Sequence, residues 1–218
     1  MKPILFNTEM VQAIQEGRKT VTRRVVKPQP PATSVVRKRD CSWDWTFWAD
    51  SDDMGHLMLP PYQPGDILWV RETWYKDVNR YMYKASYTNN EKFFRGGKEV
   101  RINWSPSIHM PMEAARLSLR VTGVRVERLQ DITEADAIKE GIKDPYDYQK
   151  PGWYEQNGLT GNYWVDAFAG FHDSTIKPAD LPLYGWEANP WVWVIEFERI
   201  SKETAIGFLV RRADNGTD

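Results

Sequence analysis

The feature that most constrains the fold is a long alternation of apolar and polar residues from Ala115 to Gln130. Leu117, Leu119 and Val121 share one face of this segment, and polar or charged residues occupy the positions between them. Such period-two alternation predicts a β-strand that is buried on one face only. Gly123 interrupts the segment, which favours a bulge or a barrel corner at this point.

Strand patterns recur along the chain and outnumber the helical ones. Alternation covers Thr20–Val26 and Trp191–Ile200, and Ile67–Trp74 and Arg80–Ser86 are further strand candidates. Clear helical patterns are limited to two segments. One starts after the capping residue Asn7 and ends at Gly17, and the other starts after Thr133 or Asp131 and ends at Gly141. Several strands with few helices predict a mainly β (α+β) fold, a closed β-barrel with flanking helices.

Composition narrows the class of protein. The chain has 218 residues, enough to bury a core without disulfide bonds, and its single cysteine, Cys41, cannot form an internal one. No apolar run approaches the length of a membrane span, and the apolar stretch at the amino terminus is too short for a signal peptide. These features predict a cytoplasmic protein with no membrane partner. The 29 Lys and Arg residues nearly balance the 30 Asp and Glu residues, so any site for a polyanion must be local.

Lys19 and Thr22 stand where the first helical pattern gives way to a strand pattern. An amine and a hydroxyl three residues apart can act together as a base and a nucleophile. At period two, Thr22 and Arg24 share one face of the strand. The same residues also fit a basic turn that leads into an ordinary edge strand.

Glu140 lies in the last turn of the second predicted helix, one turn after Asp136. The negative end of the helix dipole and the neighbouring acidic residue both disfavour a carboxylate there. Such surroundings suit a group that must sometimes hold a proton near neutral pH. A solvated surface glutamate is the simpler alternative for this residue.

Four blocks of the sequence resemble the ASCH domain, a family of small β-barrels similar to the PUA domains of RNA-modifying proteins. They are Gly17–Arg24, Pro64–Val70, Ile132–Gly141 and Trp191–Ile200, and they occur in the order expected for the family. A further segment, Trp104–Pro111, resembles one common in longer phage, prophage and bacterial members. The resemblance implies a single domain over residues 1–200, with insertions at about 28–61 and 144–187 and a tail at 201–218.

The best-defined enzymatic members of this family are amidohydrolases that act on cytidine acylated at its exocyclic amine. Carried over to this chain, the resemblance implies a catalytic set of Lys19, Thr22 and Glu140. Lys19 would act as the base, Thr22 as the nucleophile and Glu140 as the acid that protonates the departing amine. A water molecule activated by Lys19, with Thr22 only positioning the amide, is an alternative that the sequence leaves open.

Further positions are candidates for contacts with a nucleoside or nucleobase substrate: Arg24 for the developing oxyanion, Ser107 and His109 in the proline-bracketed loop, and Glu72, Trp74 and Arg116 on strand patterns. Each of these also has a purely structural explanation. No metal-ligand spacing, phosphate-binding loop or dinucleotide fingerprint occurs, so we expect no metal and no cofactor.

Some of the same residues also fit a second function of a different class. Lys19, Arg24 and Arg116 could line a surface that binds RNA without catalysis, and a ribonuclease is a variant of this hypothesis within the family. The near-zero net charge favours the amidohydrolase, because RNA binding usually leaves a basic excess. The basic runs Arg37–Arg39 and Arg95–Arg101 favour the RNA-binding alternative.

Overall fold

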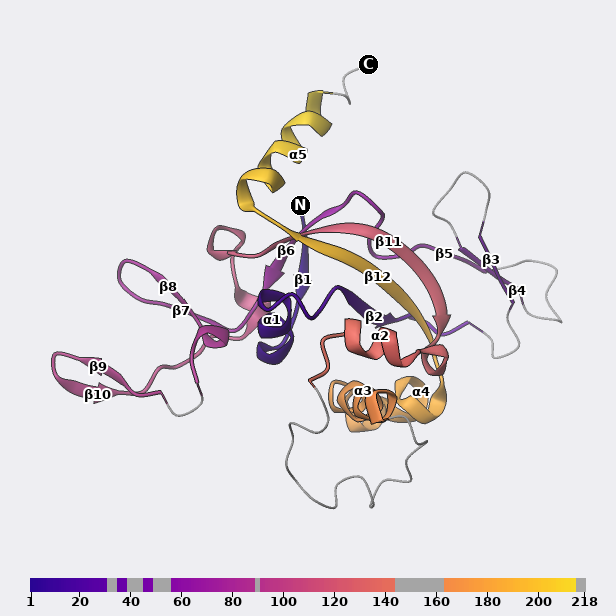
Figure 1. The fold of residues 1–218 in the computed structure, drawn as a ribbon, viewed down its shortest axis with the longest axis horizontal. Coiled ribbons are helices and arrows are strands. Elements are labelled where there is room, and N and C mark those ends of the chain that lie inside the picture. The colour runs from indigo at the N-terminus through magenta and orange to yellow at the C-terminus, as the bar shows by residue number, and fades with distance from the viewer. Residues whose placement is uncertain (31–34, 39–44, 49–55, 89–90, 144–162, 215–218) are drawn as a thin grey trace. The chain divides into compact units, whose positions relative to one another are not determined.

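The computed structural model describes residues 1–30, 35–38, 45–48, 56–88, 91–143 and 163–214, which form a mixture of strands and helices (Figure 1). The main sheet has five strands in the order β1-β6-β11-β12-β2. Their bounds are Lys2–Leu5 (β1), Ile67–Arg71 (β6), Ser118–Arg128 (β11), Trp191–Ile200 (β12) and Val21–Val25 (β2). β1 is parallel to β6, whereas β6 pairs with β11, and β12 with β2, in antiparallel fashion. The predicted α+β class is confirmed.

Three smaller sheets accompany the main one. β3 (Val35–Lys38), β4 (Trp45–Trp48) and β5 (His56–Met58) form one of them. β7 (Trp74–Lys76) pairs with β8 (Tyr81–Tyr83), and β9 (Phe93–Arg95) pairs with β10 (Lys98–Val100).

The strand order of the main sheet is open, so the strands that the structure describes do not close into the expected barrel. Closure requires every strand to pair with two neighbours. The segment Arg80–Ser86, expected as one strand, is a strand only over Tyr81–Tyr83, which pairs with Trp74–Lys76 in a separate two-stranded hairpin. Its second half, Lys84–Ser86, is the 3-10 helix η1.

The chain divides into two compact units, each assembled from segments far apart in the sequence. Unit 1 comprises Met1–Gly17, Gly65–Arg120 and Glu198–Asp218, and unit 2 comprises Arg18–Pro64 and Val121–Phe197. Of the two expected insertions, the first contains β3 to β5, and the described part of the second contains α3 (Tyr163–Ser174), η6 (Pro178–Asp180), α4 (Leu181–Tyr184) and the start of η7 (Trp186–Ala188). Residues 144–162 of the second lie outside the described part of the chain.

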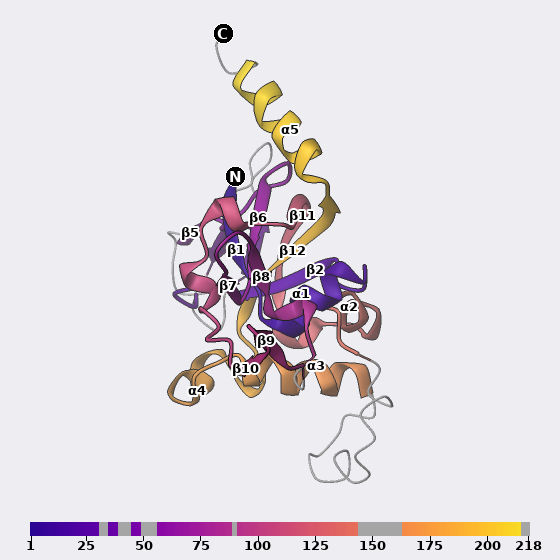
Figure 2. The ribbon, with the colours of Figure 1, turned by 90° about the vertical axis from the view of Figure 1, so that its left-hand side faces the viewer.

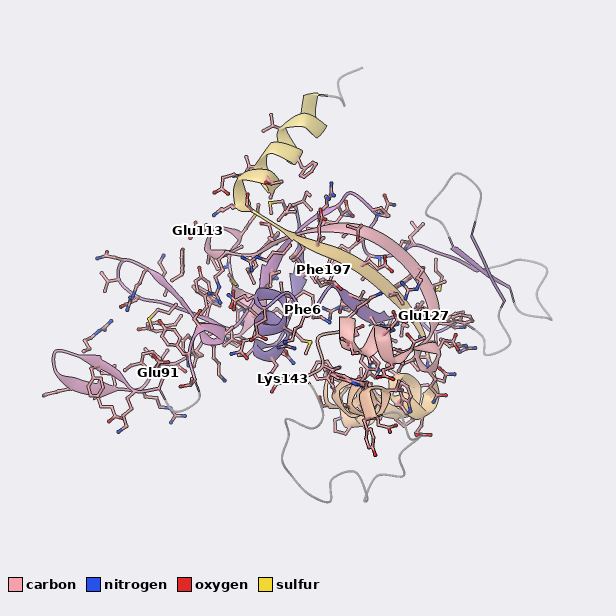
Figure 3. All side chains as sticks on the ribbon, viewed as in Figure 1. Phe6, Glu91, Glu113, Glu127, Lys143 and Phe197 are labelled. Atoms are coloured by element: carbon pink, nitrogen blue, oxygen red, sulfur yellow. The ribbon has the colours of Figure 1, made fainter. Side chains whose placement is uncertain are left out.

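In unit 1, α1 (Thr8–Gln15) begins and ends as its sequence predicts. The Asn7 side chain accepts a hydrogen bond from the Met10 amide at 2.9 Å, and Gly17 follows the helix with a φ of +77°. The apolar stripe of α1 is buried, and so is Phe6 at its entrance (Figure 3). β1 and β6 lie side by side in Figure 1 and also in the view turned by 90° (Figure 2). Unit 1 also holds η1 (Lys84–Ser86), η2 (Ser107–His109), η3 (Met112–Ala114) and α5 (Lys202–Asp214).

Unit 2 packs helices against β2 and β12. The helical segments are η4 (Leu129–Asp131), α2 (Glu134–Lys139), α3 (Tyr163–Ser174), η6 (Pro178–Asp180), α4 (Leu181–Tyr184) and η7 (Trp186–Ala188). Their shared core contains Val21, Leu129, Ile132, Ala137, Ile142, Phe168, Val192 and Val194. Burying one such aliphatic side chain contributes about 1.5–3 kcal/mol, so this core fixes α2 on the strands.

Gly123 lies within a continuous strand, because β11 runs unbroken from Ser118 to Arg128. The expected barrel corner is wrong because the sheet is open, whereas the expected bulge stays a prediction. A Cβ atom at this position would lie 2.8 Å from Oε2 of Glu196, and real Cβ contacts are longer. Any larger residue here would therefore require the Glu196 carboxylate to shift.

Candidate functional site

Lys19 lies between α1 and β2 with its side chain turned into unit 2. Lys19 as a whole is only 2% exposed to solvent. The Nζ atom donates hydrogen bonds to the backbone oxygens of Val21 (2.7 Å) and Glu140 (2.9 Å) and to Oε2 of Glu140 (2.5 Å). Three acceptors match the three donors of an ammonium group, so the geometry fixes the direction of this side chain.

Glu140 is the residue at which α2 ends. Thr133 caps the start of the helix through the Asp136 amide, and Gly141 takes a φ of +84° immediately after Glu140. The end of α2 is attached to the start of β2, because the Thr20 amide donates to the Lys139 oxygen at 2.9 Å. Lys19 and Glu140 also form an isolated antiparallel bridge. The backbone therefore sets the position of both side chains.

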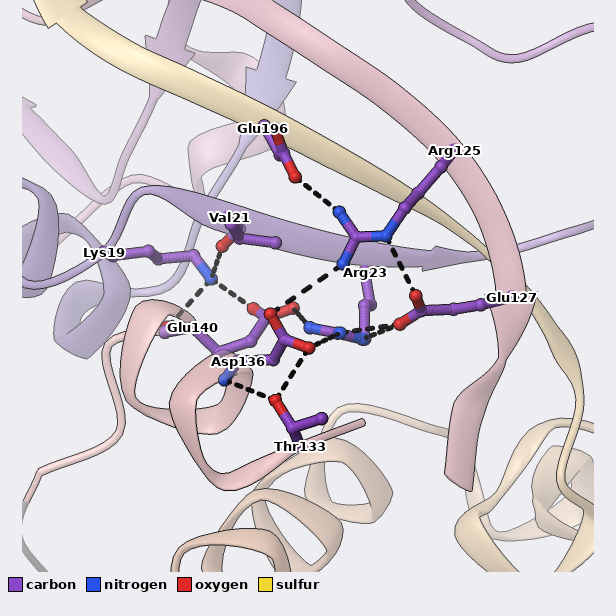
Figure 4. A network of polar contacts seen from close by, with 9 residues as sticks. All are labelled: Lys19, Val21, Arg23, Arg125, Glu127, Thr133, Asp136, Glu140 and Glu196. Carbon is purple, nitrogen blue, oxygen red and sulfur yellow. Dashed lines mark hydrogen bonds and ion pairs between the residues drawn. The ribbon is translucent and has the colours of Figure 1, made fainter. Parts of the chain in front are cut away.

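Around this pair lies a network of ion pairs in which acidic and basic groups alternate (Figure 4). Arg23 reaches Oε1 of Glu140 at 3.3 Å, Oε1 of Glu127 at 2.6 Å and Asp136 at 3.5 Å. Arg125 then joins Glu127 at 3.0 Å and Asp136 at 3.8 Å. Each carboxylate of this group has a cation beside it, which offsets the cost of burial.

Arg125 also binds the carboxylate of Glu196 at 2.5 Å, so the network extends from α2 to β12. The glycine at position 123 leaves room for that carboxylate. Sequence reasoning missed Arg125, Glu127 and Glu196 as parts of the site. Period-two spacing does place Arg125 and Glu127 on one face of β11, and this signal was present in the sequence.

Burial changes the ionisation of two groups here. Desolvation lowers the pKa of the Lys19 amine below its usual value; Glu140 opposes this through charge and a hydrogen bond, whereas Arg24 and Arg23 reinforce it. For Asp136, burial acts to raise the pKa, but the hydrogen bond from Thr133 and the charges of Arg23 and Arg125 outweigh it. The pKa of Asp136 is therefore lowered.

Thr22 is buried at 5% exposure in β2, directly opposite Ile195 of β12. Its hydroxyl makes no hydrogen bond to any residue that the structure describes. Arg24, two positions further along, is half-buried, and burial lowers the pKa of its guanidinium while Tyr62 and Glu140 act to raise it. Unit 2 contains four of the predicted site residues: Lys19, Thr22, Arg24 and Glu140.

The other predicted contact residues belong to unit 1, where Glu72 and Arg116 form a bidentate ion pair. Both nitrogen–oxygen distances are 2.8 Å, and Glu72 is only 1% exposed. The guanidinium of Arg116 also lies 4.1 Å from the ring centre of Tyr83 and donates to the Ser86 hydroxyl at 2.7 Å. This pair has the geometry of a strong structural contact.

Trp74, Ser107 and His109 occupy separate positions in unit 1. Trp74 pairs with Ser105 through its backbone, and its indole nitrogen is buried with no hydrogen-bond partner among the described residues. Ser107 and His109 are the ends of η2, where His109 is exposed. Within the described part of unit 1, no hydrogen bond joins these three side chains to each other.

Among the described residues, no group of three His, Cys, Asp or Glu side chains is placed to hold a metal ion. No helix in the same residues has the length and apolar character to cross a membrane.

Comparisons of this chain with family models, with curated proteins and with solved structures gave no match. The resemblance to the ASCH family therefore stays a prediction.

Proposed function

We propose that this protein is an amidohydrolase of the ASCH type that removes an acyl group from the exocyclic amine of cytidine or cytosine. The observation that carries the proposal is the buried contact between Nζ of Lys19 and Oε2 of Glu140 at 2.5 Å. Two residues 121 positions apart in the sequence meet at the start of the strand that carries Thr22. A base, an acid and a hydroxyl of the kinds that amide hydrolysis needs therefore belong to one structural unit.

Lys19 and Glu140 share one proton, and the transfer of this proton can make Lys19 a base and Glu140 an acid. In the charged form, Lys19 holds the proton and Glu140 is a carboxylate. Transfer of the proton along the hydrogen bond gives a neutral amine and a protonated carboxyl group. Burial of Lys19 favours this neutral form, because desolvation penalises the ammonium ion.

In the proposed reaction, neutral Lys19 accepts the proton of the Thr22 hydroxyl while the oxygen attacks the amide carbonyl carbon. A carbon–oxygen bond forms and the carbonyl becomes an oxyanion, which Arg24 can stabilise. The carbon–nitrogen bond then breaks, and Glu140 gives its proton to the leaving amine. Water releases the acyl group from Thr22 as a carboxylic acid. A water molecule activated by Lys19 could replace the hydroxyl in the first step.

The role of Arg23 in this proposal is to position Glu140. Its guanidinium contacts Oε1 and leaves Oε2 to Lys19. Arg23 is itself anchored by Glu127 through two nitrogens, at 2.6 and 3.0 Å. Glu140 is therefore fixed in rotation, which keeps proton transfer with Lys19 in line.

Incubation of the purified protein with N(4)-acetylcytidine, followed by chromatography for cytidine and acetate, tests the proposal. We expect release of both products in equal amounts. Lys19→Met should remove the activity, and Lys139→Met is the matched control because it alters an exposed lysine next to Glu140. Absence of cytidine above the blank, for acetyl and for longer acyl groups, would overturn the proposal.

A further inference from the structure

Unit 1 contains a hollow of about 650 Å³ that the proposed chemistry does not use. It is lined by residues of the β9–β10 hairpin and by Glu91, which is labelled in Figure 3. Its walls come from residues between Lys84 and Trp104. A volume of this size is within the range of small-molecule sites.

Three aromatic rings gather in the wall of the hollow. The ring centres of Tyr87 and Phe93 are 5.1 Å apart, and that of Trp104 lies 5.9 Å from Tyr87 and 6.1 Å from Phe93. All three residues are only half-buried, so part of each ring is accessible. Phe93 meets Tyr87 and Trp104 edge-on, at interplanar angles of 69° and 75°, so the rings share no plane. A flat ligand can therefore stack on the face of one ring at a time.

The charged groups around the rings leave a positive excess. Lys92 is paired with Glu99 at 3.0 Å, so these two charges offset each other. The Glu91 carboxylate accepts a hydrogen bond from the Thr88 amide at 3.3 Å. Lys84 and Arg101 form no ion pair with any residue that the structure describes. Two unpaired cations against one unpaired carboxylate favour an anionic ligand.

We propose that this hollow binds a nucleotide, with the base stacked on the aromatic surface and a phosphate group held by Lys84 and Arg101. Stacking on aromatic rings is tolerant of base identity, and cations beside the rings are the usual complement of a phosphate. A cage for a quaternary ammonium ion would use similar rings, but the excess of positive charge opposes it. The nucleotide can be free or part of a single strand of nucleic acid.

Calorimetric titration of the full-length protein tests this site with four probes: CMP, cytidine, a single-stranded RNA of ten nucleotides and tetramethylammonium. None of them carries an acyl group, so no amide is hydrolysed during the titration. Because cytidine is the product of the proposed reaction and can also bind in unit 2, the hairpin variants below assign the binding to the hollow. We expect CMP to bind more tightly than cytidine. RNA binding no tighter than CMP would assign the site to free nucleotides, and tighter RNA binding would assign it to a strand. Absence of CMP binding, or binding of tetramethylammonium in preference to CMP, would overturn the proposal.

Variants locate the binding. Phe93→Leu should weaken CMP roughly 5- to 150-fold, the range for loss of one stacking contact. Arg101→Gln should weaken CMP about tenfold, as expected for a lost charged hydrogen bond, and leave cytidine unchanged. Lys98→Gln is the matched control, because it removes an exposed charge from the same hairpin outside the hollow.

Equal effects of Arg101→Gln and Lys98→Gln would mean general attraction to a basic surface and would overturn the site. Thermal unfolding of each variant checks that it is folded. If Phe93→Leu unfolds, the Arg101→Gln variant still tests the site, because Arg101 is exposed.

Discussion

The amine of Lys19 and the carboxylate of Glu140 form an ion pair in which both side chains are at most 3% exposed. A buried pair is costly to break on one side only, because the remaining group keeps its desolvation penalty without its partner. Stability and proposed activity therefore depend on the same contact, and the experiments must separate them.

Lys19→Met should lower the free energy of unfolding by about 3 kcal/mol, since among the described residues Glu140 then keeps an ion pair with Arg23 alone. Lys19→Met combined with Glu140→Gln should cost less than the sum of the single changes, because neither group is then left charged and unpaired. Urea unfolding of the four proteins measures this coupling. A strictly additive result would mean that the ion pair adds nothing to the fold. Lys19→Met and the double variant should each hydrolyse acylcytidine at no more than about 1% of the wild-type rate.

Thr22→Ser should retain hydrolysis, and Thr22→Val should lose it, because valine keeps the shape of threonine without the hydroxyl. Both variants should fold, since the Thr22 hydroxyl makes no hydrogen bond to the described residues. Steady-state rates on N(4)-acetylcytidine compare the two. Equal rates would remove Thr22 from the mechanism as a nucleophile. Mass spectrometry after rapid quenching of the wild-type reaction looks for the acyl-threonine that covalent attack requires.

Glu140→Gln should lower kcat at least about 100-fold with little change in KM, because an amide cannot give a proton to the leaving amine. Glu127→Gln is the matched control: Glu127 shares Arg23 with Glu140 but does not contact Lys19. Comparable losses in both variants would point to a structural role for the whole network. If Glu140→Gln kept normal turnover, its assignment as the acid would be wrong.

Asp136 predicts a pH dependence of stability. Its pKa is lowered in the folded protein, so its contribution is fully present above about pH 4 and is lost as the pH falls through the folded value. The difference in unfolding free energy between the wild type and Asp136→Asn should therefore be larger at pH 7 than at pH 3. Urea unfolding at both values measures it, with the exposed Glu134→Gln on the same helix as control. A difference that does not change with pH would contradict the ion pairs of Asp136.

Local signals in the sequence predicted how the helices next to the site begin and end. Asn7 and Gly17 bound α1, and Thr133 and Gly141 bound α2, because capping hydrogen bonds and a positive φ depend on residues within one turn. Alternation likewise predicted β11 and β12, since side chains on a strand alternate by geometry alone.

Closure of the sheet and the contacts of Glu140 depended on the tertiary structure. A pattern of alternation identifies which residues share a face, but it does not specify which strand pairs with which. Tyr81–Tyr83, in the expected strand Arg80–Ser86, therefore pairs locally with Trp74–Lys76 and not with a strand of the main sheet. In the same way, the helix signals placed Glu140 at the end of α2. They did not indicate that Lys19 and Arg23 lie beside its carboxylate. Those cations lie more than 100 positions away along the chain, and only the packing of α2 on β2 brings the three charges together.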